Sequence, residues 1–389
     1  VGLSSLLTAP ATTSAGVWSR GALHRLPSGT LMGIPADPDT ALGILTAHEV
    51  ARARAERLGR PTDTDLSVGD VVAERLGDAV VDRLVEPLLG GVYAGNARLL
   101  SARAATPQLW SAISTGTSLV AAAAAAGAGA ANRIGSVFAG VVGGVGSVPS
   151  WLADRIIMQG GQIRTGVIVR GLRRSGAGWV VLAGPTTEVE QIEADAVVLA
   201  VPPAPAARLL ADHAPAAAAE LAGIATASMA IVTLALAEAD LGPVPGSGFL
   251  VPPVEGWTIK ASTFSSAKWS WLAAAGGDTA YVRASMGRAG ETASLQRPDD
   301  ELARVAHEEI GRALGRTLPA PLDVHVQRWG GALPQYAVGH VDRVAAIRAG
   351  VAAVPALEVA GAAYDGVGIP ATIGTGRRAA AVVLHELTR

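Results

Sequence analysis

The spacing of apolar residues changes along this chain, and the change limits the folds that it can adopt. Before residue 131 apolar residues recur at helical intervals, as Val68, Val72 and Leu76 do. Residues 195–200 then form a near-continuous apolar run, which is typical of a strand buried on both faces of a parallel sheet. From residue 229 the period becomes two, which predicts antiparallel strands. The sequence therefore predicts an α/β part and an α+β part.

The same patterns place the individual elements. Ser67 and Asp70 match an N-terminal capping pattern, and Pro149 suits the first turn of a helix. Helices are predicted over residues 39–57, 67–88, 99–131, 149–158, 298–316 and 374–387. Strands are predicted as a hairpin at 17–24, a pair within 161–172, and single strands at 179–182, 195–200, 229–237, 248–251, 257–262, 279–285, 324–329 and 357–361.

Composition and missing motifs exclude several classes of function. The 389 residues carry a formal net charge of −2 and no long basic run, which argues against a nucleic-acid-binding protein. There is no cysteine, so disulfides, thiolate metal sites and a cysteine nucleophile are excluded. The seven histidines lack the spacing of a local zinc site, and no metal site is predicted. The apolar stretch 119–131 is too short to span a membrane; contact with a membrane surface stays open.

One glycine-rich turn carries most of the chemical information. Residues 361–370 lie between a predicted strand and the predicted C-terminal helix. Gly366 and Gly368 let the backbone approach a ligand closely, and Pro370 suits the first turn of the helix. Free amides and the positive end of the helix dipole would then face an electron-rich group, such as the pyrimidine edge of a reduced flavin. An ordinary strand-to-helix turn explains the same residues, so both interpretations stay open at this point.

Several stretches together resemble one family of flavoproteins. The matching residues are Gly21–His24 with Leu26–Gly29, Leu88–Gly95, Leu100–Ser101 through Pro107–Leu109, Phe138 with Gly143–Val145, Leu333–Tyr336 with Gly339–His340, and Gly361–Gly376. Through these the whole chain resembles the protoporphyrinogen oxidase and coproporphyrinogen III oxidase family, a branch of the amine-oxidase-like FAD enzymes.

The resemblance implies a three-part architecture. It assigns residues 1–36 to a hairpin of the substrate domain, 37–136 to a helical domain, 137–203 to the FAD-binding domain, 204–330 to the antiparallel-sheet substrate domain, and 331–389 to the FAD-binding domain again. Relatives begin with a strand–GxGxxG–helix unit that has no counterpart here. We therefore expect a Rossmann-like FAD-binding domain that is incomplete at its N-terminal side, and we interpret Val1 as a truncated or misassigned start.

The resemblance also implies the cofactor-binding residues. Val169 matches a position whose backbone meets the adenine of FAD. Trp329 matches a position near the flavin, and Gly366 with the run Val367, Gly368 and Ile369 matches the backbone at the flavin ring. Thr372 stands where relatives often carry cysteine.

The resemblance implies a substrate with carboxylates, which need cations, and four side chains are candidates. They are Arg20, Lys260, Arg283 and Arg328, for each of which a solvated surface charge is the alternative. No side chain is identifiable as a catalytic base.

The activity implied by the resemblance is FAD-dependent oxidation of coproporphyrinogen III to coproporphyrin III in haem biosynthesis, with oxygen as acceptor and hydrogen peroxide as product. The alanine-, valine- and arginine-leaning composition is typical of a high-GC bacterium, where coproporphyrinogen is the expected substrate. Oxidation of protoporphyrinogen IX, an amine-oxidase-like activity and a non-catalytic flavoprotein remnant are the alternatives. We expect a cytoplasmic protein, with peripheral contact to the inner face of the cell membrane and transient contact with the next haem-pathway enzyme left open.

Overall fold

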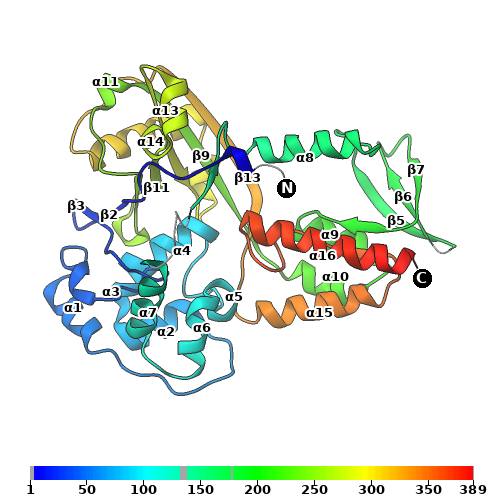
Figure 1. The fold of residues 1–389 in the computed structure, drawn as a ribbon, viewed down its shortest axis with the longest axis horizontal. Helices are drawn as coiled ribbons and strands as arrows, with labels where there is room; N and C mark the ends of the chain where they lie inside the picture. Colours follow the sequence, from blue (N-terminus) through cyan, green and yellow to red (C-terminus); the bar gives the residue numbers. More distant parts are fainter. Residues whose placement is uncertain (1–3, 132–137, 177, 389) are drawn as a thin grey trace. The chain divides into compact units, whose positions relative to one another are not determined.

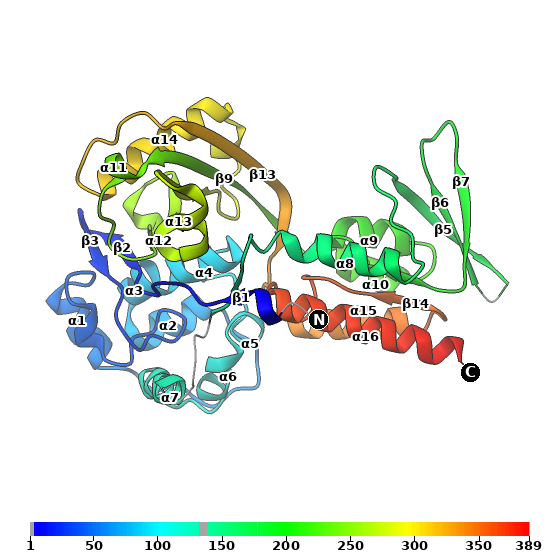
Figure 2. The ribbon, with the colours of Figure 1, turned by 45° about the horizontal axis from the view of Figure 1, so that its top comes forward.

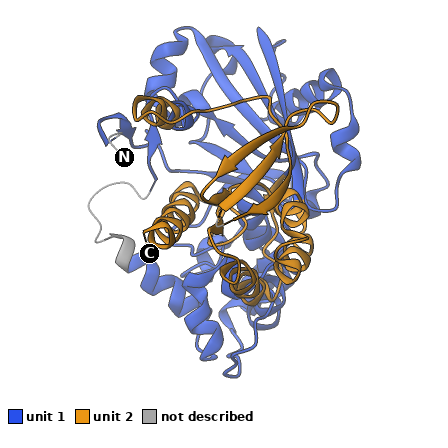
Figure 3. Cartoon of the chain, turned by 90° about the vertical axis from the view of Figure 1, so that its right-hand side faces the viewer, with its two compact units in different colours: residues 1–150, 227–331 blue, residues 151–226, 332–389 orange. Residues whose placement is uncertain are grey.

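The computed structural model describes residues 4–131, 138–176 and 178–388, which form two compact units (Figure 3). Unit 1 consists of residues 1–150 and 227–331, and unit 2 consists of residues 151–226 and 332–389. Val1 and the predicted boundary between residues 136 and 137 lie outside the described residues. The five-part division of the chain stays a prediction, and each unit is described by itself.

Short helices make up the first part of unit 1 (Figure 1). They are α1 (Ala47–Arg54), α2 (Val68–Leu76), α3 (Asp78–Val80), α4 (Glu86–Tyr93), α5 (Ala102–Ala105), α6 (Pro107–Ser114) and α7 (Leu119–Ala131), with a π-helical turn at Val81–Val85. The Ser67 hydroxyl accepts a hydrogen bond from the Asp70 amide, which confirms the predicted N-cap.

Three helices that the sequence predicts as continuous are divided or shortened in the structure. The helix predicted over 67–88 is interrupted at Gly77, whose φ of 102° lies outside helical space. Residues 39–57 contain only α1, preceded by a 3-10 turn at Pro38–Ala41. Residues 99–131 divide into α5, α6 and α7. Val72, Leu76 and Leu84 are buried on both sides of the break at Gly77, so the period of three to four did identify core residues although it missed the breaks.

A seven-stranded sheet forms the second part of unit 1, in the order β13-β9-β12-β11-β10-β2-β3. Its strands are β2 (Gly16–Ser19), β3 (Ala22–Arg25), β9 (Thr226–Ala237), β10 (Gly248–Leu250), β11 (Ile259–Phe264), β12 (Thr279–Met286) and β13 (Asp323–Pro334). The helices α11 (Glu238–Leu241), α12 (Ser265–Lys268), α13 (Ser270–Gly276) and α14 (Asp299–Ala313) connect them. A small separate pair joins β1 (Leu7–Thr8) to β4 (Gly140–Val141). The hairpin β2–β3 and the antiparallel pairs β9–β12 and β11–β12 confirm the period-two prediction, whereas β10 pairs with β2 in parallel.

One face of this sheet is packed and the other is more open. Val232, Leu234, Val282 and Ala284 alternate along β9 and β12 and are fully buried, in one cluster with Leu302 of α14. The intervening side chains point to the opposite face, because successive residues of a strand alternate. That face carries α12 and α13, and Figure 2 shows these helices and α14 on opposite sides of β9 and β13. We call this side the open face of the sheet.

A partly buried carboxylate ties α14 to the sheet. Glu309 accepts hydrogen bonds from the backbone amides of Thr258 and Ile259, at 3.0 and 2.8 Å, where β11 begins. The adjacent Glu308 lies on the solvent side and pairs with Arg304 one turn away. Glu309 therefore links α14 to β11, whereas the neighbouring Glu308 makes an ion pair within α14.

We expect Glu309→Ala to destabilise unit 1 by about 2 kcal/mol, because two partly buried amides lose a charged acceptor. Glu308→Ala is the matched control and should cost less than about 0.5 kcal/mol, as exposed pairs on a helix contribute little. Denaturant unfolding of both variants measures the difference. Equal effects of the two substitutions would show that the Glu309 carboxylate does not hold β11 to α14.

Unit 2 combines a three-stranded meander with a parallel strand pair. The meander consists of β5 (Val169–Ser175), β6 (Gly178–Ala183) and β7 (Glu190–Ala194), and the parallel pair consists of β8 (Val197–Leu199) and β14 (Leu357–Val359). The helices are α8 (Ser147–Met158), which starts at the end of unit 1, α9 (Pro203–Leu210), α10 (Pro215–Ala222), α15 (His340–Ala352) and α16 (Ile369–Leu387). Parallel pairing of β8 confirms the prediction from the apolar run.

Two predictions in this part of the chain are wrong. Residues 161–168 form no strand, so the strand pair predicted within 161–172 is replaced by a single strand that starts at Val169. The apolar run is also not buried on both faces, since Val198 is 40% exposed. Leu199 and Val359 pack in one cluster with α9, α10 and α15, whereas α16 contacts β14 and β8 without burying Val198. Among the described residues, no helix is long and apolar enough to cross a membrane.

Candidate functional site

The glycine-rich turn of unit 2 connects the end of β14 to α16. Gly361 and Gly366 have φ values of 131° and 145°, a region that residues with a side chain rarely adopt. The helix starts at Ile369 instead of the predicted Gly374, and Pro370 lies in its first turn. Proline fixes its own φ near the helical value, so it begins the helix five residues earlier than the apolar pattern alone indicates.

Side chains of α16, of α15 and of the segment before α15 hold this turn in place. The Gly361 amide donates to the Thr375 hydroxyl of α16 at 2.9 Å, and the Tyr336 hydroxyl donates to the Ala362 carbonyl at 2.6 Å. Arg348 of α15 pairs with the Asp365 carboxylate at 2.6 Å. The backbone of the turn is therefore fixed before any ligand binds.

The start of α16 offers unsatisfied donors to an electron-rich group. The amides of Val367, Gly368 and Ile369 meet no acceptor among the described residues, and no side chain caps the helix. The positive end of the helix dipole lies at the same place. A Cβ at Gly366 would come within 2.9 Å of the Ala371 Cβ, so a side chain there would displace the first turn of the helix. These residues fit a flat, electron-rich ring lying against bare backbone, as the sequence predicted for a flavin.

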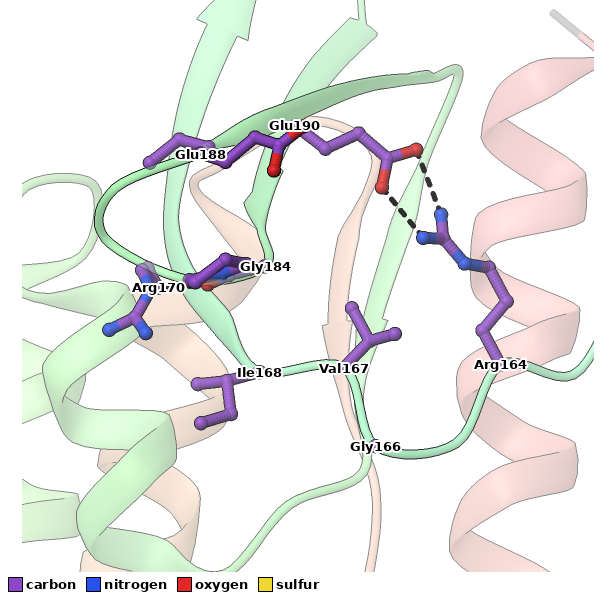
Figure 4. Close-up of a pocket in the computed structure, with 10 residues that line it drawn as sticks. Arg164, Gly166, Val167, Ile168, Arg170, Gly184, Glu188 and Glu190 are labelled. Carbon is purple, nitrogen blue, oxygen red and sulfur yellow. Dashed lines mark hydrogen bonds and ion pairs between the residues drawn. The ribbon is translucent and has the colours of Figure 1, made fainter.

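A second feature of unit 2 surrounds Val169, the predicted adenine contact. The neighbouring Ile168 and Arg170 line a cavity of about 650 Å³ between the approach to β5 and the loop that follows β6. Figure 4 shows Arg164 and Glu190 facing each other on one side of it, and their guanidinium and carboxylate groups pair at 2.6 Å. The rest of the lining combines apolar side chains and glycine backbone with the charged Arg170 and Glu188, so the cavity is of mixed polarity.

One hydrophobic cluster joins these two features. Val169 packs against the cluster that contains Ala363 and Tyr364 of the turn and Leu357 and Val359 of β14. Tyr364 has no hydrogen-bond partner for its buried hydroxyl among the described residues, and burial raises its pKa to about 12. The phenol stays neutral at physiological pH and is a structural side chain of the turn. The structure thus brings the predicted adenine contact and the predicted flavin turn into one unit.

Trp329, the remaining predicted flavin contact, belongs to unit 1. It lies on β13, is 51% exposed, and lines a small cavity of about 170 Å³ with Met229 of β9. The neighbouring Val326 and Arg328 face α14, so Trp329 points to the open face. An aromatic side chain left half in solvent on a sheet is available to contact a ligand.

Two of the four predicted substrate cations are engaged in the fold. Arg20 pairs with Glu49 at 2.7 Å and donates to the Ile44 carbonyl, which anchors the β2–β3 turn to the start of α1. Arg328 pairs with Asp299 and donates to the Arg297 carbonyl, which fixes β13 to the start of α14. The contacts of both side chains favour a role in holding the fold over a role in substrate binding.

Lys260 is buried to 3% exposure, and its ammonium has no hydrogen-bond partner among the described residues. It lies at a bulge of β11, where the register with β12 shifts between Ile259 and Ala261. Burial lowers the pKa of Lys260 to about 8, and the nearby Arg288 charge adds to the effect while Glu291 opposes it. The ammonium reaches no surface, so it offers no direct contact to a substrate in this conformation.

Arg283 is the predicted cation that remains exposed and unpaired. It lies on β12 opposite Thr263 and Thr233 of the neighbouring strands, and it makes no hydrogen bond or ion pair with any described residue. Its neighbours in the chain, Val282 and Ala284, are buried on the α14 side, so Arg283 stands on the open face. Sequence reasoning missed Lys268 of α12, which lies close enough for the Arg283 charge to affect its pKa. The sequence did contain a signal for this side of the sheet. Polar residues alternate with Val282 and Ala284, which places Arg283 on the face opposite to the core.

Comparison with known proteins identifies the family to which this chain is similar. A family model described as "Flavin containing amine oxidoreductase" matches residues 1–384. A coproporphyrinogen III oxidase of Mycobacterium leprae (strain TN) is 36% identical over 100% of this chain and 83% of its own length. A coproporphyrinogen III oxidase of Bacillus subtilis (strain 168) is 29% identical, again over 100% of this chain and 83% of its own length.

Solved structures give the same result for the fold. A crystal structure from Exiguobacterium sp. 255-15, described as a "Putative protoporphyrinogen oxidase", superposes with a TM-score of 0.83 and 29% identity over 99% of this chain and 83% of that chain. Cyclohexylamine oxidase from Brevibacterium oxydans IH-35A superposes with a TM-score of 0.62 at 14% identity, over 98% of this chain and 83% of its own, which indicates a shared fold alone. The mixed helix and sheet architecture predicted from the sequence is therefore confirmed.

Proposed function

Because the chain belongs to the flavin-containing amine oxidoreductase family, we propose that it is an FAD-dependent oxidase of coproporphyrinogen III. The observation that carries this proposal is the match of the whole chain, at 36% identity, to a coproporphyrinogen III oxidase. The glycine turn before α16 supports it, because bare backbone at an uncapped helix start fits a flavin ring. The product is coproporphyrin III, and oxygen is the electron acceptor.

The proposal assigns different parts of FAD to different residues of unit 2. Gly366, Val367, Gly368 and Ile369 hold the flavin ring by their backbone, with the helix dipole stabilising negative charge on the reduced ring. Val169 meets the adenine end, for which the adjoining cavity of about 650 Å³ leaves room. Trp329 of unit 1 is retained as a flavin contact on the resemblance alone.

The protein contributes orientation and shielding to the reaction. FAD supplies the chemistry that accepts hydride, and molecular oxygen is the final electron acceptor, reduced to hydrogen peroxide. The turn is held by Tyr336, Arg348 and Thr375, so the ring is positioned without a rearrangement on binding. No general base is assigned: the carboxylate of the turn, Asp365, is paired with Arg348. We place the reaction on the cytoplasmic side of the membrane.

Protoporphyrinogen IX is the second candidate substrate. A protoporphyrinogen oxidase of Bos taurus is 29% identical over 77% of this chain and 65% of its own length. Its similarity is lower and covers less of the chain than that of the M. leprae protein, so we favour coproporphyrinogen III.

A two-part experiment tests the proposal. The purified chain should carry FAD in its visible absorption spectrum, and aerobic incubation with coproporphyrinogen III should produce the fluorescence of coproporphyrin III together with hydrogen peroxide. We expect a higher kcat/KM with coproporphyrinogen III than with protoporphyrinogen IX. Bound FAD without oxidation of either porphyrinogen would refute the substrate class and leave the family assignment standing.

A further inference from the structure

The open face of the sheet in unit 1 carries two cations with no counter-ion. Arg283 of β12 and Lys268 of α12 form no ion pair with any described residue. Lys268 does lie near the Trp269 ring, with its ammonium 5.6 Å from the ring centroid. Burial lowers the pKa of Lys268, and the charge of Arg283 lowers it further, so the two cations repel each other.

The surroundings of these two cations favour the binding of an anion. The side chains flanking Arg283 across the strands, Thr233 and Thr263, are short, so nothing on the sheet covers the guanidinium. α12 and α13 stand beside it on the same face: the Ser266 hydroxyl of α12 accepts from the Tyr281 amide, and a Cβ at Gly276 of α13 would lie 3.3 Å from the Tyr281 ring. A carboxylate placed between the two cations would cancel their repulsion in a partly desolvated place, where charge pairing is stronger than in water.

The same face offers an apolar surface for a ring. Trp329 of β13 points to it, and β9 is the single strand between β13 and β12. Arg283 lies opposite Thr233 of β9, whereas Trp329 lies beside Met229 of the same strand. Two strand spacings of about 4.8 Å and four residues of about 3.3 Å along the strand therefore separate Trp329 from Arg283 by about 16 Å. A flat macrocycle of porphyrinogen size can contact Trp329 and still reach Arg283 with a side-chain carboxylate.

We propose that Arg283 and Lys268 form the subsite for a carboxylate that coproporphyrinogen III carries and protoporphyrinogen IX lacks, and that this pair makes the enzyme prefer the more highly carboxylated substrate. The proposal rests on the proposed function for the identity of the macrocycle. The residues that hold the cofactor in unit 2 take no part in it. The pair therefore affects which porphyrinogen binds and not whether the flavin does.

The test compares two substrates in one set of variants. Arg283→Gln should raise KM for coproporphyrinogen III about 10-fold, as expected for the loss of a charge-assisted hydrogen bond, and should raise KM for protoporphyrinogen IX less than about 3-fold. Arg283→Gln with Lys268→Gln should abolish the preference, and Arg283→Lys should restore part of it. Arg304→Gln, which removes an exposed cation of α14 on the opposite side of the sheet, is the matched control. Flavin content should stay that of the parent protein throughout.

A binding measurement separates this proposal from the proposed function. Titration with the stable porphyrins, followed by fluorescence, should show weaker binding of coproporphyrin III and nearly unchanged binding of protoporphyrin IX in the double variant. Equal changes for both porphyrins, or no change for either, would overturn the proposal even if the enzyme turns over. Failure of the parent protein to oxidise both porphyrinogens would instead refute the proposed function, whereas selective binding would still support the carboxylate subsite.

Discussion

Gly366→Val is expected to reduce the affinity for FAD about 100-fold. The φ of 145° at this position strains any residue with a side chain, and the new Cβ would lie 2.9 Å from Ala371 in the first turn of α16. Relief of that clash must move the backbone amides proposed to contact the flavin, and the valine side chain would stand where the ring lies. The ratio of flavin to protein absorbance after purification, and titration of the apoprotein with FAD, measure the effect.

Gly374→Ala is the matched control for this experiment. Gly374 lies in the same helix, and an added Cβ there would meet nothing within 4 Å. Alanine in a helix interior is favoured over glycine by about 1 kcal/mol, so this variant should be slightly more stable and should keep its flavin. If Gly366→Val retains a full complement of FAD while remaining folded, the turn does not contact the flavin and the assignment of residues 366–369 is wrong.

The second large effect is expected at Lys260, where removal of a charge should stabilise the protein. Lowering the pKa of this lysine from 10.5 to about 8 corresponds to about 3 kcal/mol in favour of unfolding. Lys260→Met keeps a long unbranched side chain and removes the unpartnered ammonium, so it should raise the free energy of unfolding at pH 7 by up to that amount.

The stability gained by Lys260→Met should depend on pH, and the direction of this dependence follows from the lowered pKa. Below pH 8 the lysine is protonated in both the folded and the unfolded chain, and the full penalty is present. Between pH 8 and 10.5 the unfolded chain binds more protons than the folded one, so the parent protein gains stability as the pH rises. The advantage of Lys260→Met should therefore shrink over this interval and vanish above it. Thermal unfolding at pH 7, 9 and 10.5 measures this, and a variant less stable than the parent at pH 7 would show that Lys260 has a stabilising partner.

The elements of unit 1 were predicted correctly where a single sequence pattern, such as strict alternation, determined the structure. Strict alternation along residues 229–237 and 279–285 identified β9 and β12, because each strand has one face in the core. The break at Gly77 was not predictable from periodicity, since the residues on both sides of it keep the same apolar spacing. The start at Ser67 was placed correctly because a capping residue marked it. Pro370 was recognised as suited to a first helical turn, but the helix was still predicted to begin at Gly374 from its apolar pattern.

Site residues were predictable to a different extent. The bare backbone at Gly366 and Gly368 follows from the residue types, and the structure gives it the conformation that glycine permits. The fates of the four cations did not follow, because they depend on long-range neighbours: Arg20 finds Glu49, Arg328 finds Asp299, and a bulge buries Lys260. Of the four predicted cations, Arg283 is the one that stays exposed and makes no hydrogen bond or ion pair with a described residue, and its face is set by the register of three strands.

The parallel pair β8–β14 has a consequence for the order in which the chain folds. Its two strands are separated by more than 150 residues of sequence, and residues 227–331 of unit 1 lie between them. On the ribosome, both segments of unit 1 are complete before Leu357 is synthesised. The apolar side chains of α9 and α10 must therefore wait for α15 and β14 to cover them. Unit 2 is thus the late-forming part of the molecule and the part that most needs protection from aggregation while the chain is being made.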